Sequence, residues 1–423
     1  MASASARAPR RPRNSPMTPP AAPVAPLLKP IYQADQFVAL ARRFMEMPTA
    51  PYGEHLVAAE IGRFVQERPA LELSADAHGN LLIRYEGRHK AADRAAGHWV
   101  LTAHLDHPGF LVRRSLSGCR VEMEFLGGVA REYFPGAPIA LFNLDRSARQ
   151  RPLKAVVLEA RMAKDERGRR RVKTVIAKLR RPLPAATRLD DRWIGMWDLP
   201  TCERRGDTLR GRVMDDLAAV VCALAVLDTC HRRRPTVRVD LLLTRAEEVG
   251  LCGMIAATRS RALSKSANYL NLECSNFRGR AEMGAGPIVR VGDLMTAFDP
   301  GVTGALMEIA RPSVAAGTLA LQRKLMDGGT CEATALCNEG YRAGAVCLAL
   351  KNYHNMGERN KIAPECISIR DALGLIHLCW LLIHATGGAA GAVRTQKLRV
   401  AHILDLNARA SDARLRNSRF LLR

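Results

Sequence analysis

The chain has 423 residues, of which 48% are hydrophobic and only 5% aromatic, so it can bury a large core and is long enough for two domains. No apolar run reaches the roughly 20 residues that cross a bilayer, and the sequence therefore predicts no membrane span. The net charge of +23, from 64 Lys and Arg against 41 Asp and Glu, fits either an anionic partner or basic tails.

The positive charge is concentrated in the N-terminal 30 residues, in residues 146–181 and in the residues after 393. None of these stretches has the interleaved aromatic residues of a single-strand binder, so we favour basic tails and do not predict nucleic acid as a partner. The eleven cysteines are odd in number and include no Cys-x-x-Cys pair. Free thiols of this kind favour a reducing compartment, and we predict a cytoplasmic protein.

The chain begins with a basic arm, residues 1–31, that is rich in Ala, Pro, Ser and Arg and has no acidic residue before Asp35. Such a segment cannot bury a core by itself and is expected to be disordered. Helical spacing of apolar residues follows from Tyr32, and residues 71–85 predict two strands around a turn.

Residues 110–207 differ from the rest of the chain, because short alternating runs there are separated by Gly, Pro and charged residues. This pattern predicts a small all-β domain inserted into an α/β body. The body, residues 32–109 and 208–386, alternates strands with helices, which predicts a mixed, mostly parallel sheet covered by helices. From residue 387 the chain is expected to loosen into a basic C-terminal tail, residues 387–423.

Strand-like runs of the body repeatedly stop at residues that bind metals. Singly, each has an ordinary explanation: a His after a strand is usually a hydrogen-bonded core residue, an Asp-Asp pair before a helix an N-cap, and a Glu-Glu pair a solvated loop. In an open α/β sheet, however, the carboxyl ends of the strands share one edge. Two His and three carboxylates brought together there suit two divalent ions, zinc, cobalt or manganese. The five predicted ligands are His104, Asp215, Glu248, Glu273 and His354.

Two further carboxylates are predicted to act beside these ligands in catalysis. Asp106 follows His104 by two residues and can accept the second imidazole N–H, which fixes the tautomer; its alternative role is a turn cap. Glu247 precedes Glu248 and can take a proton from metal-bound water and pass it to a leaving amine.

These motifs and their order resemble the glutamyl and tetrahedral aminopeptidases, which are dinuclear zinc exopeptidases of bacteria and archaea. The resemblance extends from about residue 32 to 386, and the Glu-Glu-Val-Gly-Leu-x-Gly piece is its most specific part. The matching pieces are Ala103-His-Leu-Asp-His-Pro-Gly-Phe110, Phe125-Leu-Gly-Gly128, Met214-Asp-Asp216, Glu247-Glu-Val-Gly-Leu-Cys-Gly253, Asp327-Gly-Gly-Thr330 and Tyr353-His354.

The resemblance implies a role for each matched residue. Asp215 would bridge both metals, with His104 and Glu273 at one ion and Glu248 and His354 at the other. The residue before Glu248 would be the general base. The inserted β-domain would serve assembly, which in such enzymes often gives large hollow homo-oligomers.

Three departures from the family pattern stand out. Glu273 occupies a position where the family usually has Asp, and His107 and Pro108 replace the usual Glu-Ile. Cys331 and Glu332 replace the usual Asp-Ala after Gly-Gly-Thr, which predicts an altered substrate pocket.

We therefore predict a metallo-aminopeptidase that releases N-terminal residues from peptides. Two alternatives stay open at this point. One is a carboxypeptidase or an N-acyl-amino-acid deacylase, since related folds share these ligands, although their extra domain usually lies later in the chain. The other is a non-catalytic basic protein that kept the fold, which salt-dependent polyanion binding without hydrolysis would favour.

Overall fold

The computed structural model describes residues 30–87, 98–146, 150–165, 168–183, 188–260, 263–277, 281–385 and 388–417. The predicted basic arm, residues 1–31, lies almost wholly outside these ranges. Among the described residues, no helix is both long enough and apolar enough to cross a membrane.

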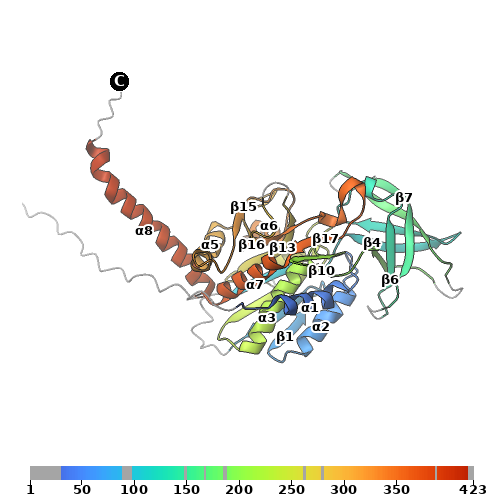
Figure 1. Cartoon of the computed structure of the whole chain (residues 1–423), viewed down its shortest axis with the longest axis horizontal. Helices are drawn as coiled ribbons and strands as arrows, with labels where there is room; N and C mark the ends of the chain where they lie inside the picture. The colour runs from blue at the N-terminus through green and yellow to red at the C-terminus, as the bar shows by residue number, and fades with distance from the viewer. Residues whose placement is uncertain are drawn as a thin grey trace, which may run out of the picture.

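An eight-stranded mixed sheet forms the centre of the body (Figure 1). In spatial order its strands are β1 (Leu71–Ala75), β2 (Leu81–Glu86), β12 (Arg238–Thr244), β3 (Trp99–His104), β13 (Asn268–Asn276), β16 (Arg342–Leu350), β14 (Ile288–Arg290) and β15 (Gln322–Lys324). The four central strands, β12, β3, β13 and β16, run parallel, whereas β2 and β14 pair with them antiparallel. The predicted α/β class is confirmed, and the carboxyl ends of the four central strands meet at one edge.

Side-chain alternation along the strands builds a core on each face of the sheet. On β12, Leu241 and Leu243 belong to the larger core, whereas Leu242 between them belongs to the core on the opposite face. The larger core is packed by the helices α1 (Ala34–Met45), α2 (His55–Gln66), α3 (Leu217–Arg233), α5 (Pro300–Ala315) and α7 (Ile369–Ile383). The smaller core is packed by α4 (Cys252–Arg259) and α6 (Glu332–Asn338).

A closed barrel lies at one end of the molecule (Figure 1). Around the barrel its strands are β4 (Gly109–Leu116), β5 (Arg120–Leu126), β8 (Arg170–Leu179), β7 (Leu153–Lys164), β6 (Pro138–Asn143) and β9 (Trp193–Trp197). Its core is separate from those of the body and contains an aromatic cluster in which Phe134 lies 4.9 Å from Phe125 and 5.3 Å from Trp197, measured between ring centroids. The short helix η2 (Arg131–Tyr133) leads into this cluster.

A small three-stranded sheet joins the end of the barrel segment to the body. It consists of β10 (Glu203–Arg205), β11 (Thr208–Gly211) and β17 (Glu365–Ser368), and β17 leads directly into α7. The barrel itself therefore ends at β9, and the predicted domain boundary at residue 207 remains a prediction. The short helices η3 (Tyr353–Asn355) and η4 (Glu358–Asn360) lie between β16 and β17.

The C-terminal segment differs from its prediction, because residues 388–417 form the long helix α8 (Gly388–Asn417) rather than a loosened tail. Its first half packs on α5, where a Cβ on Gly304 would lie 2.7 Å from Gln396 Cδ, and where Arg399 Nε lies 2.6 Å from Glu308 Oε2. The helix is thus packed closely on a glycine of α5, and the composition of the C-terminal segment alone did not predict this tertiary contact. Beyond that contact, α8 extends away from the body (Figure 1).

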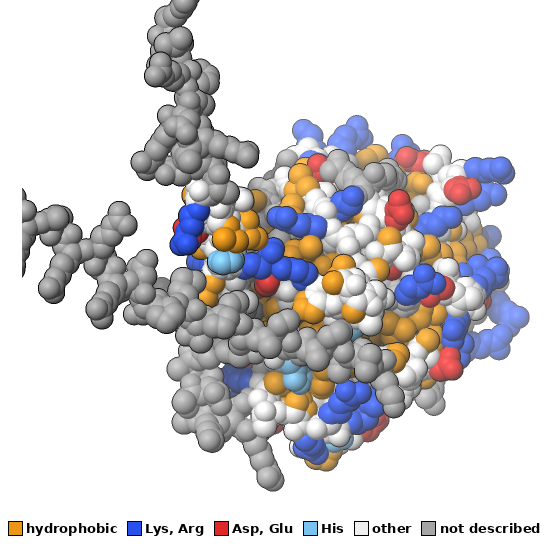
Figure 2. Space-filling view, turned by 60° about the vertical axis from the view of Figure 1, so that its left-hand side comes forward, with side chains coloured by type: hydrophobic (Ala, Val, Ile, Leu, Met, Phe, Trp, Pro, Cys, Tyr) orange, Lys and Arg blue, Asp and Glu red, His pale blue; other side chains and the backbone are white. Residues whose placement is uncertain are grey.

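On the face of the molecule that includes the base of α8, the positive charge is spread out and is not collected in one patch (Figure 2). Figure 2 shows Lys and Arg side chains scattered across that face, with apolar and uncharged surface between them. Many arginines also pair with carboxylates, as Arg43 does with Glu60 and Glu67.

Candidate metal centre

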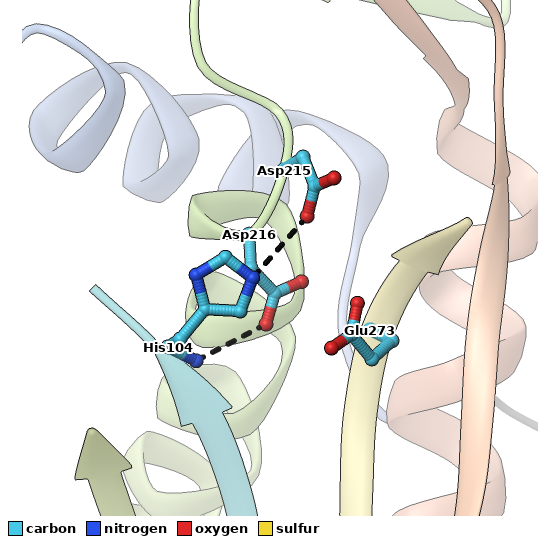
Figure 3. Close-up of side chains that lie close together, drawn as sticks. All are labelled: His104, Asp215, Asp216 and Glu273. Atoms are coloured by element: carbon cyan, nitrogen blue, oxygen red, sulfur yellow. Dashed lines mark hydrogen bonds and ion pairs between the residues drawn. The ribbon is translucent and has the colours of Figure 1, made fainter. Parts of the chain in front are cut away.

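The carboxyl edge of the central sheet brings the predicted ligands together. Figure 3 shows part of this cluster, His104, Asp215 and Glu273 with Asp216. His104 is the last residue of β3 and pairs with Thr244, the last residue of β12, so the loop carrying Glu247 and Glu248 begins beside His104. Glu273 lies three residues before the end of β13 rather than at its tip. It still reaches the same edge, because β13 pairs with β3 only as far as Asn271 and then continues beyond it.

Asp215 and Asp216 enter the site from the loop before α3 (Figure 3). The backbone N–H groups of Met214 and Asp215 both donate to Glu365 Oε2, at 2.7 and 3.1 Å, and this fixes the loop. Asp216 Oδ2 accepts from the backbone N–H of His104 at 3.3 Å. The peptide bond between the two aspartates is cis.

His354 lies in η3 and has a left-handed backbone with φ of 55°. Its N–H donates to Glu365 Oε1 at 2.8 Å, and its Nδ1 lies 2.9 Å from the carbonyl oxygen of Gly128 on the barrel side. Its Nε2 is therefore directed at the cluster, 3.1 Å from Glu248 Oε2 and 3.7 Å from Asp215 Oδ2. Glu365 thus holds the loops of both Asp215 and His354.

The two oxygens of Asp215 face different imidazoles. Oδ1 lies 3.4 Å from His104 Nε2, and Oδ2 lies 3.7 Å from His354 Nε2. Around this carboxylate three groups of ligand-type atoms lie within 4.8 Å of one another. The groups are His104, Asp215, Asp216 and Glu273; Asp215, Glu248 and His354; and His104, Glu247 and Glu248. The structure thus gathers all five predicted ligands with Glu247, and it adds Asp216.

The electrostatics of the cluster are those of an excess of buried negative charge. Burial raises the pKa of Glu273 to about 8, and burial together with Glu273 and Glu248 raises the pKa of Glu247 well above its usual range. Burial lowers the pKa of His354, but Glu248 and Asp215 outweigh it and raise the value to about 9. Both the carboxylates and the imidazoles thus favour their protonated forms, because the site holds more negative charge than positive charge. A bound cation would compensate this excess of negative charge.

Asp106 has a wider role than the predicted one. His104 Nδ1 lies 3.1 Å from the Asp106 carbonyl oxygen and 3.5 Å from its carboxylate Oδ1. The same carboxylate accepts the backbone N–H groups of Glu247 at 2.9 Å and Glu248 at 3.1 Å. Asp106 therefore orients the loop of Glu247 and Glu248 as well as the imidazole of His104.

Two departures from the family pattern also have contacts in the structure. His107 Nε2 lies 2.9 Å from Asn355 Oδ1, and its Nδ1 lies within hydrogen-bonding distance of the Asp215 carbonyl oxygen, so it links the two ligand loops. Glu332 is fully buried and accepts the hydroxyl of Thr244, the last residue of β12, and the predicted alteration of the substrate pocket stays a prediction. Burial raises the pKa of Glu332 to about 7.

Sequence reasoning missed Glu365 and Asp216, both of which contact the predicted ligands. The position of Glu365 in a short strand gives no motif that could have found it. Asp216 was visible beside Asp215, but the pattern offered no reason to separate the two.

The fold of the chain is similar to the folds of several solved aminopeptidases. A tetrahedral aminopeptidase from Thaumarchaeota archaeon SCGC AB-539-E09 matches with a TM-score of 0.68 at 16% identity, covering 86% of this chain and 100% of its own. An aminopeptidase from Desulfurococcus kamchatkensis matches with 0.67 at 17% identity, covering 86% and 98%. The Pyrococcus horikoshii TET1 peptidase, described as assembling into a tetrahedron or a large octahedral shell, matches with 0.64 at 17% identity, covering 82% and 99%.

At these identities the likeness shows the fold alone, and the sequence itself shows the family. The family model for M42 glutamyl aminopeptidase matches residues 79–363, which is more than half of the chain. The protein belongs to the M42 glutamyl aminopeptidase family and is a peptide hydrolase. No curated protein matches the chain significantly by sequence.

Proposed function

We propose that this protein is an aminopeptidase that uses two divalent metal ions and Glu247 as its general base. The observation that carries the proposal is the division of the Asp215 carboxylate between His104 and His354. A carboxylate whose two oxygens face two separate imidazoles is the arrangement expected of a ligand that bridges two ions. The family match favours an aminopeptidase over the carboxypeptidase and deacylase alternatives.

The donor set fits two ions. One would be held by His104, Glu273 and Asp215, and the other by His354, Glu248 and Asp215. Imidazole and carboxylate ligands suit zinc, cobalt or manganese, and zinc is the expected ion. Buried carboxylate oxygens are also left over, since Oδ1 of Asp215 and Oδ1 of Asp216 accept no hydrogen bond from the described residues. Unpaired buried oxygens of this kind are costly unless a cation or proton compensates them.

When bound, two divalent ions polarise a carbonyl oxygen and lower the pKa of water to near neutrality. Glu247 is placed to act on that water, because its Oε2 lies 4.0 Å from His104 Nε2 and its N–H is held by Asp106. Its carboxylate accepts a proton from the attacking water and then donates it to the nitrogen of the leaving amine. Its buried position raises its pKa, which favours the first of these steps, the uptake of the proton.

The surplus of carboxylates over imidazoles also supports exopeptidase action. A free α-amino group at the substrate's N-terminus carries the charge that this cluster lacks, whereas an internal peptide bond does not. We infer that the site selects the N-terminal residue in this way.

We further propose that the protein assembles into a homo-oligomer and that the barrel takes part in its contacts. Support comes from the solved relatives, one of which is described as a dodecamer in the asymmetric unit and another as forming tetrahedral or octahedral shells. Light scattering on the purified chain tests this. The eleven cysteines, all of which lie in the described ranges, are free, in keeping with the proposed cytoplasmic location.

The deciding experiment combines metal analysis with an aminopeptidase assay. We expect about two divalent ions per chain and hydrolysis of aminoacyl chromogenic substrates that a chelator abolishes and added zinc, cobalt or manganese restores. The N-acetylated form of the best substrate serves as a control and should be inert. Chelator-insensitive hydrolysis, or equal hydrolysis of the acetylated substrate, would contradict the proposal.

A further inference from the structure

The loop that carries Glu247 and Glu248 is bound by side chains through four consecutive backbone amides. The N–H of Arg245 donates to Asn80 Oδ1 at 3.2 Å, and that of Ala246 donates to Glu54 Oε1 at 3.0 Å. The next two amides donate to the carboxylate of Asp106, as described above. The three acceptors come from three separate parts of the chain, and each is at most 1% exposed.

Asn80 also closes the loop at its far end. Its side-chain amide donates to the Gly253 carbonyl oxygen at 3.0 Å, and the Gly253 N–H donates to the Arg245 carbonyl oxygen at 2.9 Å. A Cβ on Gly253 would lie 2.5 Å from Asn80 Oδ1, so this close approach requires glycine. The first and last residues of the loop are thus tied to the same side chain.

Glu54 holds the start of this loop through both of its carboxylate oxygens. Its Oε1 accepts from the backbone N–H groups of both Ala246 and Tyr52, at 3.0 and 2.9 Å. Its Oε2 lies 2.9 Å from Arg245 Nε and 2.8 Å from Arg245 Nη2. A charge-assisted pair of this kind, with a buried carboxylate and a partly exposed guanidinium, is stronger than a neutral hydrogen bond.

The backbone of the loop explains why such a frame is needed. Ala246 has φ of 52°, in the left-handed region that residues other than glycine rarely adopt. A conformation of this kind persists only where its surroundings hold it. Ala246 directly precedes the base, so relaxing its backbone would displace the Glu247 carboxylate.

The geometry points to Glu54 as a positioning residue for catalysis: it holds Ala246 in its strained conformation, which sets the place of Glu247. This inference rests on the proposed function, in which Glu247 is the base. Glu54 itself contacts none of the predicted ligand side chains in the described contacts, and its effect is transmitted through the backbone of the loop.

The test compares two substitutions of Glu54 with one matched control in the metal-loaded full-length protein. Glu54→Gln keeps an oxygen for the two amides but turns an NH₂ group toward Arg245, whereas Glu54→Ala removes every contact. Glu60→Gln is the control, because Glu60 is also a buried carboxylate bound by two arginines, and its contacts are with Arg43 and Arg63, outside the loop.

We expect kcat to fall roughly 10-fold in Glu54→Gln and roughly 100-fold in Glu54→Ala, as misplacement of a reacting group by about 1 Å can produce. KM and the metal content should stay unchanged, and hydrogen exchange of the amides of residues 245–248 should accelerate in proportion. In Glu60→Gln, kcat and the exchange of these amides should remain at the wild-type level even if the thermal midpoint falls.

Wild-type kcat in Glu54→Ala, or unchanged exchange in the loop, would overturn the inference. The exchange measurement also separates the two proposals. If the wild-type protein hydrolyses no aminoacyl substrate, the proposed function fails, while faster exchange confined to residues 245–248 in the Glu54 variants would still support the frame.

Discussion

The barrel and the carboxyl edge of the central sheet are buried to a similar degree but by opposite means. The barrel core consists of aliphatic and aromatic side chains, and Phe134 and Trp197 at its centre are at most 1% exposed. The sheet edge instead buries imidazoles and carboxylates, among them His104, Asp215 and Glu332, each at most 2% exposed.

This difference separates two uses of burial. In the barrel, burial removes apolar surface from water and stabilises the fold. At the sheet edge, burial opposes ionisation and raises the pKa values of Glu247, Glu273 and Glu332. A substitution in the barrel should therefore change stability with little effect on turnover, whereas a substitution of the proposed base at the edge should change turnover with little effect on stability.

Glu247→Gln gives the largest expected effect. It removes the proposed base without changing the size of the side chain, so kcat should fall about 10³-fold, while the metal content and the free energy of unfolding stay near wild type. Steady-state kinetics with metal analysis measures both. Full activity in this variant would show that Glu247 does not carry the proton.

Phe134→Ala should have the opposite signature. The cavity left among Phe110, Phe125 and Trp197 should lower the free energy of unfolding by about 3–4 kcal/mol, while kcat per folded molecule changes less than about twofold. Urea unfolding supplies the measurement, and Leu158→Ala on the exposed surface of β7 is the matched control. A large loss of kcat in folded Phe134→Ala would mean that the barrel and the edge are coupled.

Glu332 provides a pH test of the sheet edge in chelator-treated protein. Its pKa is raised to about 7 by burial, so its contribution to stability is fully present below the unfolded value near 4.3 and is lost as the pH rises through 7. Glu332→Gln should remove this dependence, which makes the variant about 2–3 kcal/mol more stable than wild type at pH 8 but not at pH 4. The same difference in the free energy of unfolding between the two proteins at pH 4 and at pH 8 would contradict this prediction.

Asp106→Asn should have the smallest effect. The substitution keeps one oxygen acceptor for the base loop and removes the other, so activity or metal affinity should fall about 10-fold. Metal is titrated into chelator-treated protein while the activity is measured, and this separates a loss of metal affinity from a loss of turnover. If the variant has the metal affinity and turnover of the wild type, Asp106 acts only as a cap of the turn in which it lies.

Much of the site was readable from the sequence because its residues lie at the ends of strongly apolar strands. His104, Glu247 and Glu248 follow such runs directly, and the parallel arrangement of the strands brought them to one edge as expected. Glu273 was found for the same reason, although it lies inside its strand. The Glu-Glu motif also identified the family, which the family match confirmed.

The residues that escaped prediction act through contacts between distant segments. Glu365 and Glu54 hold backbone amides that lie 150 or more residues away in the chain. Helix α8 was missed because its basic composition resembles a tail, whereas its packing on Gly304 and its pairing with Glu308 are contacts with the distant helix α5.

The sequence by itself determined the α/β class, the family and the set of ligand-type residues, because alternating apolar patterns and short motifs are local properties. Only the tertiary structure decided how Asp215 divides its oxygens, which amides hold the base loop and what Glu332 contacts. Those features depend on distances between segments that are remote in sequence, and no local pattern encodes them.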